Sequence, residues 1–303
     1  MRSIPLFLLL LPAMTVSCGS QEEAPGQKAF SSPEDAVVAL VQAARTDNKA
    51  EITAIFGPDA QKVLASGDPV MDRRSVEVFL AAYEERAQLT NENDKRTLLI
   101  GNEEWPFPIP LVKENWKWRF DTAAGVKEVL FRRIGRNELS TITACRTFVE
   151  AQKEYAKKPH DGKPAGAYAQ KFASTPGKQD GLYWKNEESQ EPSPLGELAA
   201  QAAAEGYRRS GDQPVPFHGY YFRMLTAQGK NADGGARNYL KDGEMREGFS
   251  LIALPAEYGS SGIVTFIVNQ DGIVREKDLG PNTAQIAAQI TKFDPDSSWD
   301  TAH

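Results

Sequence analysis

The chain has 303 residues, a formal net charge of −6 and a hydrophobic content of 41%, which are ordinary values for a globular protein. Acidic residues outnumber basic ones by 41 to 35, and this balance argues against a general nucleic-acid surface. Two cysteines cannot form a disulfide framework if one of them is modified, so the fold must be held together by burial of apolar side chains.

The first residues have the pattern of an export signal. A short basic start precedes an apolar run over residues 4–16, which is too short to span a bilayer as a helix. The step from Ser17 to Cys18 resembles a bacterial lipobox, although Thr15 stands where an aliphatic residue is usual. We therefore expect a signal peptide over residues 1–17 and lipid on Cys18. The alternative is an ordinary secretory signal that is cut nearby.

A polar segment rich in Gly, Pro and Glu follows the cysteine, and residues 18–29 are predicted to be a flexible tether. In a Gram-negative cell, Gly19 after the cysteine, in place of an aspartate, would favour release of the lipoprotein to the outer membrane, where it would face the periplasm. The membrane would then be a partner through the lipid anchor.

An N-terminal α+β domain is predicted over residues 30–158. Ser32 is a good N-cap, and Pro33 suits the first helical position. Further helices are predicted within residues 49–66 and 73–89 because apolar side chains recur there at helical spacing. The period then changes to two, which predicts a small antiparallel sheet.

Helices followed by a hairpin with alternating aromatic residues resemble the start of the nuclear-transport-factor-like, or cystatin-like, cone fold, over residues 30–121. That fold often holds a pocket, so the resemblance implies that Trp105, Trp116 and Trp118 line one. The alternative is that these tryptophans serve core and edge packing, which the lack of an accompanying His–Asp pair favours.

The remaining N-terminal domain is predicted to be mostly helical over residues 125–158, with a break near Gly135 as one possibility. Cys145 lies in an apolar-periodic stretch, which is typical of a small buried side chain and not of a nucleophile. Residues 159–193, rich in Pro, Gly and polar side chains with interspersed aromatic ones, are predicted to be a loop-rich connector laid on the surface.

A C-terminal domain over residues 194–292 is predicted to start with an alanine-rich helix and continue as an antiparallel β-meander, with residues 293–303 as a tail. In the stretch VTFIVNQDGIVREKD, over residues 264–278, Asp271 and Gly272 supply turn chemistry. We interpret the pair as a turn and not as a site. The fold class is therefore α+β.

The stretches YAQKFASTPGKQDGLYW, YYFRMLTAQG and GFSLIALPAEYGSSGIVTFIVNQDGIVREKDLGP resemble the bacterial family known as domain of unknown function 2950. The resemblance covers residue 32 to the C-terminus. Because that family has no established activity, it implies no catalytic residues.

The tail is also similar, more loosely, to the sheet of pilin-like head domains. A signal peptide stands where a pilin would carry its long apolar helix, so polymerisation as a pilus subunit is not expected. The matching positions are Gly219, Tyr220, Phe222, Leu225, Thr226, Gly248, Phe249, Leu251, Ala253, Pro255, Gly262, Phe266, Val268, Gly272, Val274 and Arg275.

The sequence contains no P-loop, GxSxG, HExxH or CxxC motif, so it predicts no catalytic residue, metal site or cofactor. His218, Tyr220 and Arg223 form the one cluster whose residue types suit acid–base chemistry. The alternative is a histidine at the start of a strand that donates to backbone. We expect a cell-envelope lipoprotein that is a non-catalytic binding or assembly module for an unidentified envelope protein or ligand. The alternative is an enzyme of unknown reaction, or a small-ligand binder, that uses a pocket in the N-terminal domain.

Overall fold

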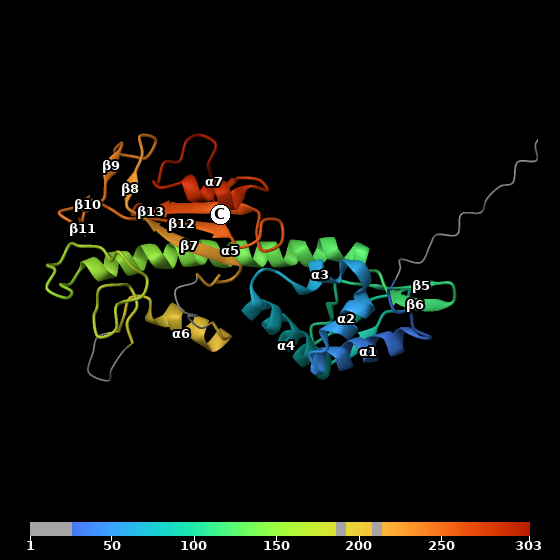
Figure 1. Cartoon of the computed structure of the whole chain (residues 1–303). Coiled ribbons are helices and arrows are strands. Elements are labelled where there is room, and N and C mark those ends of the chain that lie inside the picture. The colour runs from blue at the N-terminus through green and yellow to red at the C-terminus, as the bar shows by residue number, and fades with distance from the viewer. Residues whose placement is uncertain (1–25, 186–191, 208–213) are drawn as a thin grey trace, which may run out of the picture.

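The computed structural model describes residues 26–185, 192–207 and 214–303. These residues form two lobes that share one long helix, α5 (Thr122–Ala156), as Figure 1 shows. Helices and small antiparallel sheets make up the N-terminal lobe, and a five-stranded antiparallel sheet dominates the C-terminal lobe. The predicted α+β class is confirmed. Cys18 and the predicted signal peptide lie outside the described residues.

Four helices open the N-terminal lobe, and each of the two longer ones starts at a side-chain cap. Ser32 Oγ accepts from the backbone N–H of Asp35 at 3.0 Å, as predicted for the first helix. Asp68 caps the fourth helix through Val70 and Met71. The elements are α1 (Pro33–Arg45), α2 (Lys49–Phe56), the 3₁₀ turn η1 (Gly57–Asp59), α3 (Ala60–Leu64) and α4 (Pro69–Glu85).

Two three-stranded antiparallel sheets follow these helices. One has the order β1-β3-β4 and the other the order β2-β5-β6. Ile100, Leu111 and Phe120 turn inward from these strands onto the apolar sides of α1 and α2. The strands are β1 (Ala87–Leu89), β2 (Lys95–Arg96), β3 (Leu98–Ile100), β4 (Trp105–Pro106), β5 (Leu111–Glu114) and β6 (Lys117–Phe120).

Helix α5 runs without interruption past Gly135, where an added Cβ would meet nothing within 4 Å. Its first turns pack on the N-terminal lobe, since Gly125 lies directly against Ile109. Its second half, including Cys145 and Phe148, packs on the C-terminal sheet. The helix predicted to end the N-terminal domain at residue 158 therefore belongs to both lobes.

The C-terminal sheet has the order β15-β14-β13-β12-β7 and is covered on both faces. Leu251 and Phe266 point toward α5, whereas Ile252 and Ile267 point toward α7 (Thr283–Gln289). This alternation follows from the period of two in a strand. The strands are β7 (Tyr220–Leu225), β12 (Ser250–Pro255), β13 (Val264–Asn269), β14 (Arg275–Asp278) and β15 (Asp300–Thr301).

Two further segments complete the C-terminal lobe. Residues 293–303 were predicted to be a tail, but they contribute β15 to the sheet through the pairing of Thr301 with Arg275. The turn after β13 is confirmed, because Gly272 has φ of +81° and its N–H donates to Asn269 O at 3.0 Å. The remaining elements are α6 (Gly196–Glu205), β8 (Ala227–Gln228), β9 (Arg237–Asn238), β10 (Leu240–Lys241) and β11 (Glu244–Met245).

Across residues 26–185, 192–207 and 214–303, no helix is both long enough and apolar enough to cross a membrane.

Candidate functional site

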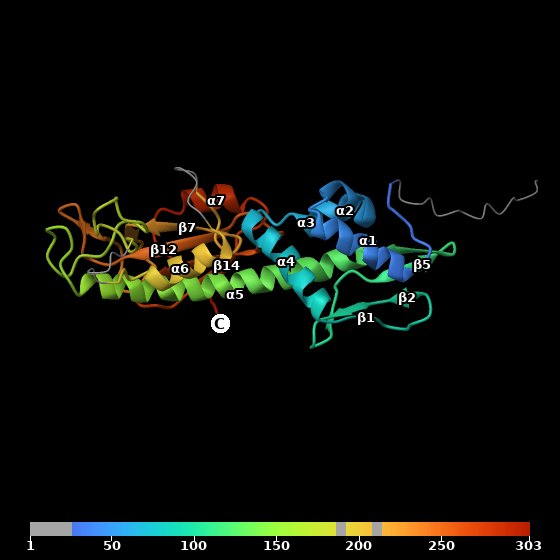
Figure 2. The same ribbon diagram turned by 90° about the horizontal axis from the view of Figure 1, so that it is seen from below.

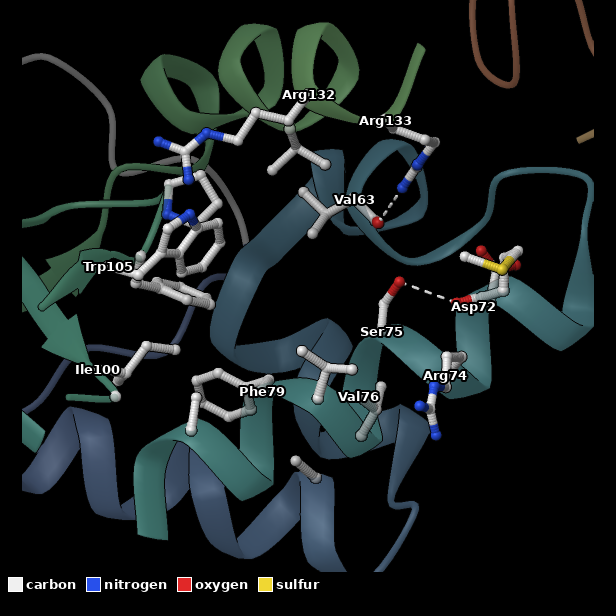
Figure 3. Close-up of a pocket in the computed structure, with 18 of the residues that line it drawn as sticks. Val63, Asp72, Arg74, Ser75, Val76, Phe79, Ile100, Trp105, Arg132 and Arg133 are labelled. Atoms are coloured by element: carbon white, nitrogen blue, oxygen red, sulfur yellow. Dashed lines mark hydrogen bonds between the residues drawn. The ribbon is translucent and has the colours of Figure 1, made fainter. Parts of the chain in front are cut away.

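A cavity of about 930 Å³ lies where α4 crosses α5, between the two lobes. Figure 2 shows α4 passing across α5, and Figure 3 shows the side chains that line the space between them. Apolar side chains from α1, α2, α3, α4, α5, β3 and the residue after β4 form most of the wall. They are Leu40, Ala44, Ile52, Phe56, Val63, Leu64, Met71, Val76, Val78, Phe79, Ala82, Ile100, Phe107 and Val129.

Helix α4 forms one side of this cavity without being packed into the protein. Among its residues, all of which the structure describes, none is buried. Its C-terminal half contacts the N-terminal core through Phe79, whose ring lies 5.3 Å from that of Phe107. Val78 is 54% exposed although it lines the cavity. The apolar stripe of an amphipathic helix is normally buried against a core. In α4, the described residues of the chain bury this stripe only in part.

Trp105 and Arg132 lie together in the wall of the cavity. The Arg132 guanidinium lies 4.6 Å from the Trp105 ring centroid. Figure 3 shows the arginine side chain over the tryptophan ring. Arg132 also pairs with Glu128 at 2.6 Å and donates to the carbonyl of Pro106 at 3.0 Å. Three contacts therefore hold this arginine in place over the tryptophan face.

Arg133, one position further on, has a different role. It is buried, and it donates to the carbonyls of Val63 and Ala65 at the end of α3 and to Ser260 Oγ of the C-terminal lobe. Burial lowers the pKa of Arg133 below its usual range. A cation at a helix C-terminus satisfies carbonyls that have no partner within the helix. Arg133 is therefore a structural tie between the lobes, whereas Arg136 of the same helix is exposed at the cavity.

The N-terminus of α4 is fixed by a second tie between the lobes. The buried carboxylate of Asp68 accepts from the Tyr207 hydroxyl at 2.6 Å and from the Gly219 N–H at 2.9 Å. Burial, followed by the hydrogen bond to Asp68, raises the pKa of Tyr207. The position of α4 over the cavity thus depends on the C-terminal lobe.

The structure separates the three tryptophans that the cone-fold resemblance grouped. Trp105 lines the cavity. Trp116 lies at the tip of the β5–β6 hairpin and is 87% exposed, and Trp118 is 6% exposed within the N-terminal core. Neither of these two contributes to the cavity wall.

The cluster of His218, Tyr220 and Arg223 is also dispersed. The Tyr220 hydroxyl donates to Val264 O inside the C-terminal core, and Arg223 donates to the carbonyls of Ala287 and Ile290 at the end of α7. Only His218 of the three borders the cavity.

His218 borders the cavity beside the carboxylate of Glu205, which lies 2.8 Å from its Nε2. Its other ring nitrogen, Nδ1, is buried and has no hydrogen-bond partner among the described residues. Because Nδ1 is shielded and Nε2 is occupied, the ring offers no accessible atom for proton transfer with a molecule in the cavity. The backbone φ of His218 is +49°.

The sequence pattern did not indicate the roles of α4 and of the arginines on α5. The sequence shows the apolar face of α4 clearly, with Val76, Phe79, Leu80 and Tyr83 at helical spacing. Spacing alone does not distinguish a face that meets a core from one that meets a cavity. Across the described ranges, no group of three or more His, Cys, Asp or Glu side chains is placed to hold a metal ion.

The model of the family described as "Protein of unknown function (DUF2950)" matches residues 27–302. A search of curated proteins and a search of solved structures gave no match.

Proposed function

We propose that this chain, which belongs to the DUF2950 family of proteins of unknown function, is a non-catalytic binding module that holds an apolar or amphiphilic small molecule between α4 and α5. The observation that carries the proposal is the apolar side of α4, which faces a cavity where an amphipathic helix would ordinarily face a core.

The size and lining of the cavity suit such a ligand. Ligand sites are concave, mostly apolar and about 300–1,000 Å³, with a few placed polar groups. The volume of about 930 Å³ falls at the upper end of that range. The wall also carries charged side chains of both signs, with Arg132 and Arg136 on the α5 side and with Asp72, Glu85 and Glu103 elsewhere. A molecule with an apolar body and one acidic or polar end beside the arginines suits this distribution.

Three titratable groups at or near the cavity are engaged by partners within the chain, which argues against a catalytic role for these three. Arg133 is engaged by carbonyls of α3, and Asp68 is engaged by four N–H or O–H donors. His218 is paired with Glu205. A general base needs a free atom within hydrogen-bond reach of the reacting group, and none of these three side chains offers one.

The proposal includes attachment to the cell envelope through lipid on Cys18, with the folded part facing the periplasm. The sequence pattern of residues 1–18 supports it. Labelled palmitate should enter the protein and be lost in a Cys18→Ala variant. Label that persists in this variant would contradict lipidation at Cys18.

A cavity-filling substitution tests the binding proposal. Val76→Trp places a large ring in the cavity, whereas Val38→Trp makes the same change at a position on α1 that is 61% exposed. A fluorescent fatty acid should bind the wild-type chain and Val38→Trp, and its binding to Val76→Trp should be at least ten-fold weaker, about the effect of 1.4 kcal/mol. Equal binding by the two folded variants would exclude the cavity as the site.

A further inference from the structure

We infer that the β5–β6 hairpin is a membrane-contact surface, with Trp116 entering the interface of an anionic lipid bilayer and the surrounding lysines binding its headgroups. The inference concerns a surface at the far end of the N-terminal lobe from α6 and β7 (Figure 1). The proposed lipid on Cys18 would orient this surface toward the membrane, so this part rests on the proposed function. The residues of the surface are separate from those of the cavity.

Trp116 occupies a position that packing within the chain does not explain. Glu114 pairs with Lys117 across the hairpin, so Asn115 and Trp116 form a two-residue turn. Both turn residues have positive φ, +47° and +66°. Asparagine and glycine suit this turn type, whereas a bulky residue with positive φ is uncommon. The chain thus places a tryptophan in an unfavourable backbone conformation while leaving its side chain 87% exposed.

The surroundings of Trp116 are basic in a chain that is acidic as a whole. Lys113 Nζ lies 5.3 Å from the Trp116 ring centroid. Arg119 and Glu114 pair with each other through two hydrogen bonds, of 2.9 and 2.6 Å, and so balance their charges. The other basic side chains of β2, β5, β6 and the turn before β2 are Lys95, Arg96, Lys113 and Lys117. The other acidic side chains of these segments are Glu92 and Asp94.

This combination fits a bilayer surface. Tryptophan is enriched at the level of lipid headgroups because its ring is amphipathic. Lysine and arginine near an anionic leaflet are attracted to it. A hairpin tip with an exposed tryptophan between Lys113 and Lys117 presents both features at once.

The path of the chain brings the hairpin toward the proposed anchor. Phe30 and Trp118 exchange two backbone hydrogen bonds, of 2.8 and 2.9 Å, and Gln27 Nε2 donates to Phe120 O at 2.7 Å. Residues 27–30 therefore run beside β6. Gly26 follows Cys18 by eight positions, which span at most about 29 Å when fully extended. Lipid on Cys18 would hold Gly26, which precedes the segment beside β6, within that distance of the bilayer.

Quenching of tryptophan fluorescence by brominated lipid tests the contact directly. The full-length protein would be reconstituted into phosphatidylcholine vesicles with phosphatidylglycerol, with bromine on the acyl chains. Trp116→Phe removes the proposed contact, and Trp299→Phe removes a tryptophan that lies over Lys277 in the C-terminal lobe. The wild type and Trp299→Phe should be quenched, whereas Trp116→Phe should lose most of the quenching. Undiminished quenching in Trp116→Phe would overturn the inference.

Charge variants give a second, independent readout. In a Cys18→Ala background, Lys113→Gln should lower the affinity for anionic vesicles about five-fold, which corresponds to about 1 kcal/mol for one basic residue. Lys241→Gln, an exposed lysine of β10, should leave the affinity unchanged. An equal effect of both variants would contradict a specific membrane contact at the hairpin.

Two further outcomes separate this inference from the proposed function. If palmitate label is absent while vesicle quenching still depends on Trp116, lipidation fails and the membrane contact stands. If Trp116→Phe changes the oligomeric state by light scattering but not the quenching, the hairpin binds a second copy of the chain, and the inference is overturned. Loss of ligand binding in Val76→Trp bears on neither result, because Val76 lies at the cavity.

Discussion

The Tyr207 hydroxyl donates to the Asp68 carboxylate at 2.6 Å, and this bond joins residues that are 139 positions apart. Asp68 at the same time caps α4 through the N–H groups of Val70 and Met71. One buried carboxylate therefore fixes both the start of the helix over the cavity and its attachment to the C-terminal lobe.

Tyr207→Phe should destabilise the protein by about 1.5–3 kcal/mol, the range for a hydrogen bond to a charged group. The variant removes a donor from Asp68 and leaves the N–H of His218 without its acceptor. Tyr258→Phe is the matched control, because the Tyr258 hydroxyl also meets an aspartate, Asp278, but at 3.3 Å and in an exposed position. Urea unfolding should show a shift for Tyr207→Phe alone, and equal shifts would contradict the role given to Asp68.

Two glycines of α5 should respond in opposite directions to alanine. Gly125→Ala should cost about 1–3 kcal/mol, because the new Cβ would lie 2.8 Å from the Cα of Ile109. Gly135→Ala should instead stabilise by about 0.5–1 kcal/mol, since the helix passes this open position without a break. Thermal melts of the two variants check the sign of each effect. Destabilisation by Gly135→Ala would contradict a continuous α5.

Burial raises the pKa of the Cys145 thiol to about 12, above the ordinary value of 9.0. The folded state thus keeps the proton that the unfolded state releases, so stability should fall as pH rises from about 9 toward 12. Cys145→Ala should lessen that fall. Urea midpoints across this pH window provide the measurement. In a Cys18→Ala background, a thiol reagent should label Cys145 only after denaturation, and rapid labelling of the folded protein at neutral pH would contradict the burial.

The turn after β13 gives a prediction that separates a turn from a site. Gly272→Val should lose about 1–3 kcal/mol, because its φ of +81° strains a β-branched residue. Asp271→Asn should be nearly silent, since an amide oxygen retains local turn bonding with Asn269. Melts and a ligand-binding assay on both variants decide the matter. A stable Asp271→Asn protein that had lost binding would show that the aspartate is functional.

Local sequence patterns predicted the caps and turns that are stabilised by interactions between neighbouring residues. The cap at Ser32, the start of the first helix at Pro33 and the turn at Gly272 each depend on a few neighbouring residues. Alternation in the C-terminal strands predicted a sheet, and the sheet is present with both faces covered.

The candidate site required information that local patterns do not carry. Alternation placed Trp116 with Trp118, but the two-residue turn interrupts the alternation at Trp116 and leaves Trp118 alone in the core. Residues of β7 at odd separations point to opposite faces, so Tyr220 and Arg223 lie on different sides of the sheet. The contact of Asp68 with Tyr207 joins the two lobes, and no pattern within either segment indicates it.

The most direct test of the binding proposal is native mass spectrometry of the protein purified from cells, before and after extraction with organic solvent. We predict an additional mass on the wild-type chain that passes into the organic phase, and its absence from Val76→Trp but not from Val38→Trp. A wild-type protein that carries no such mass and binds no fatty-acid probe on titration would contradict the proposal that the cavity between α4 and α5 holds a ligand.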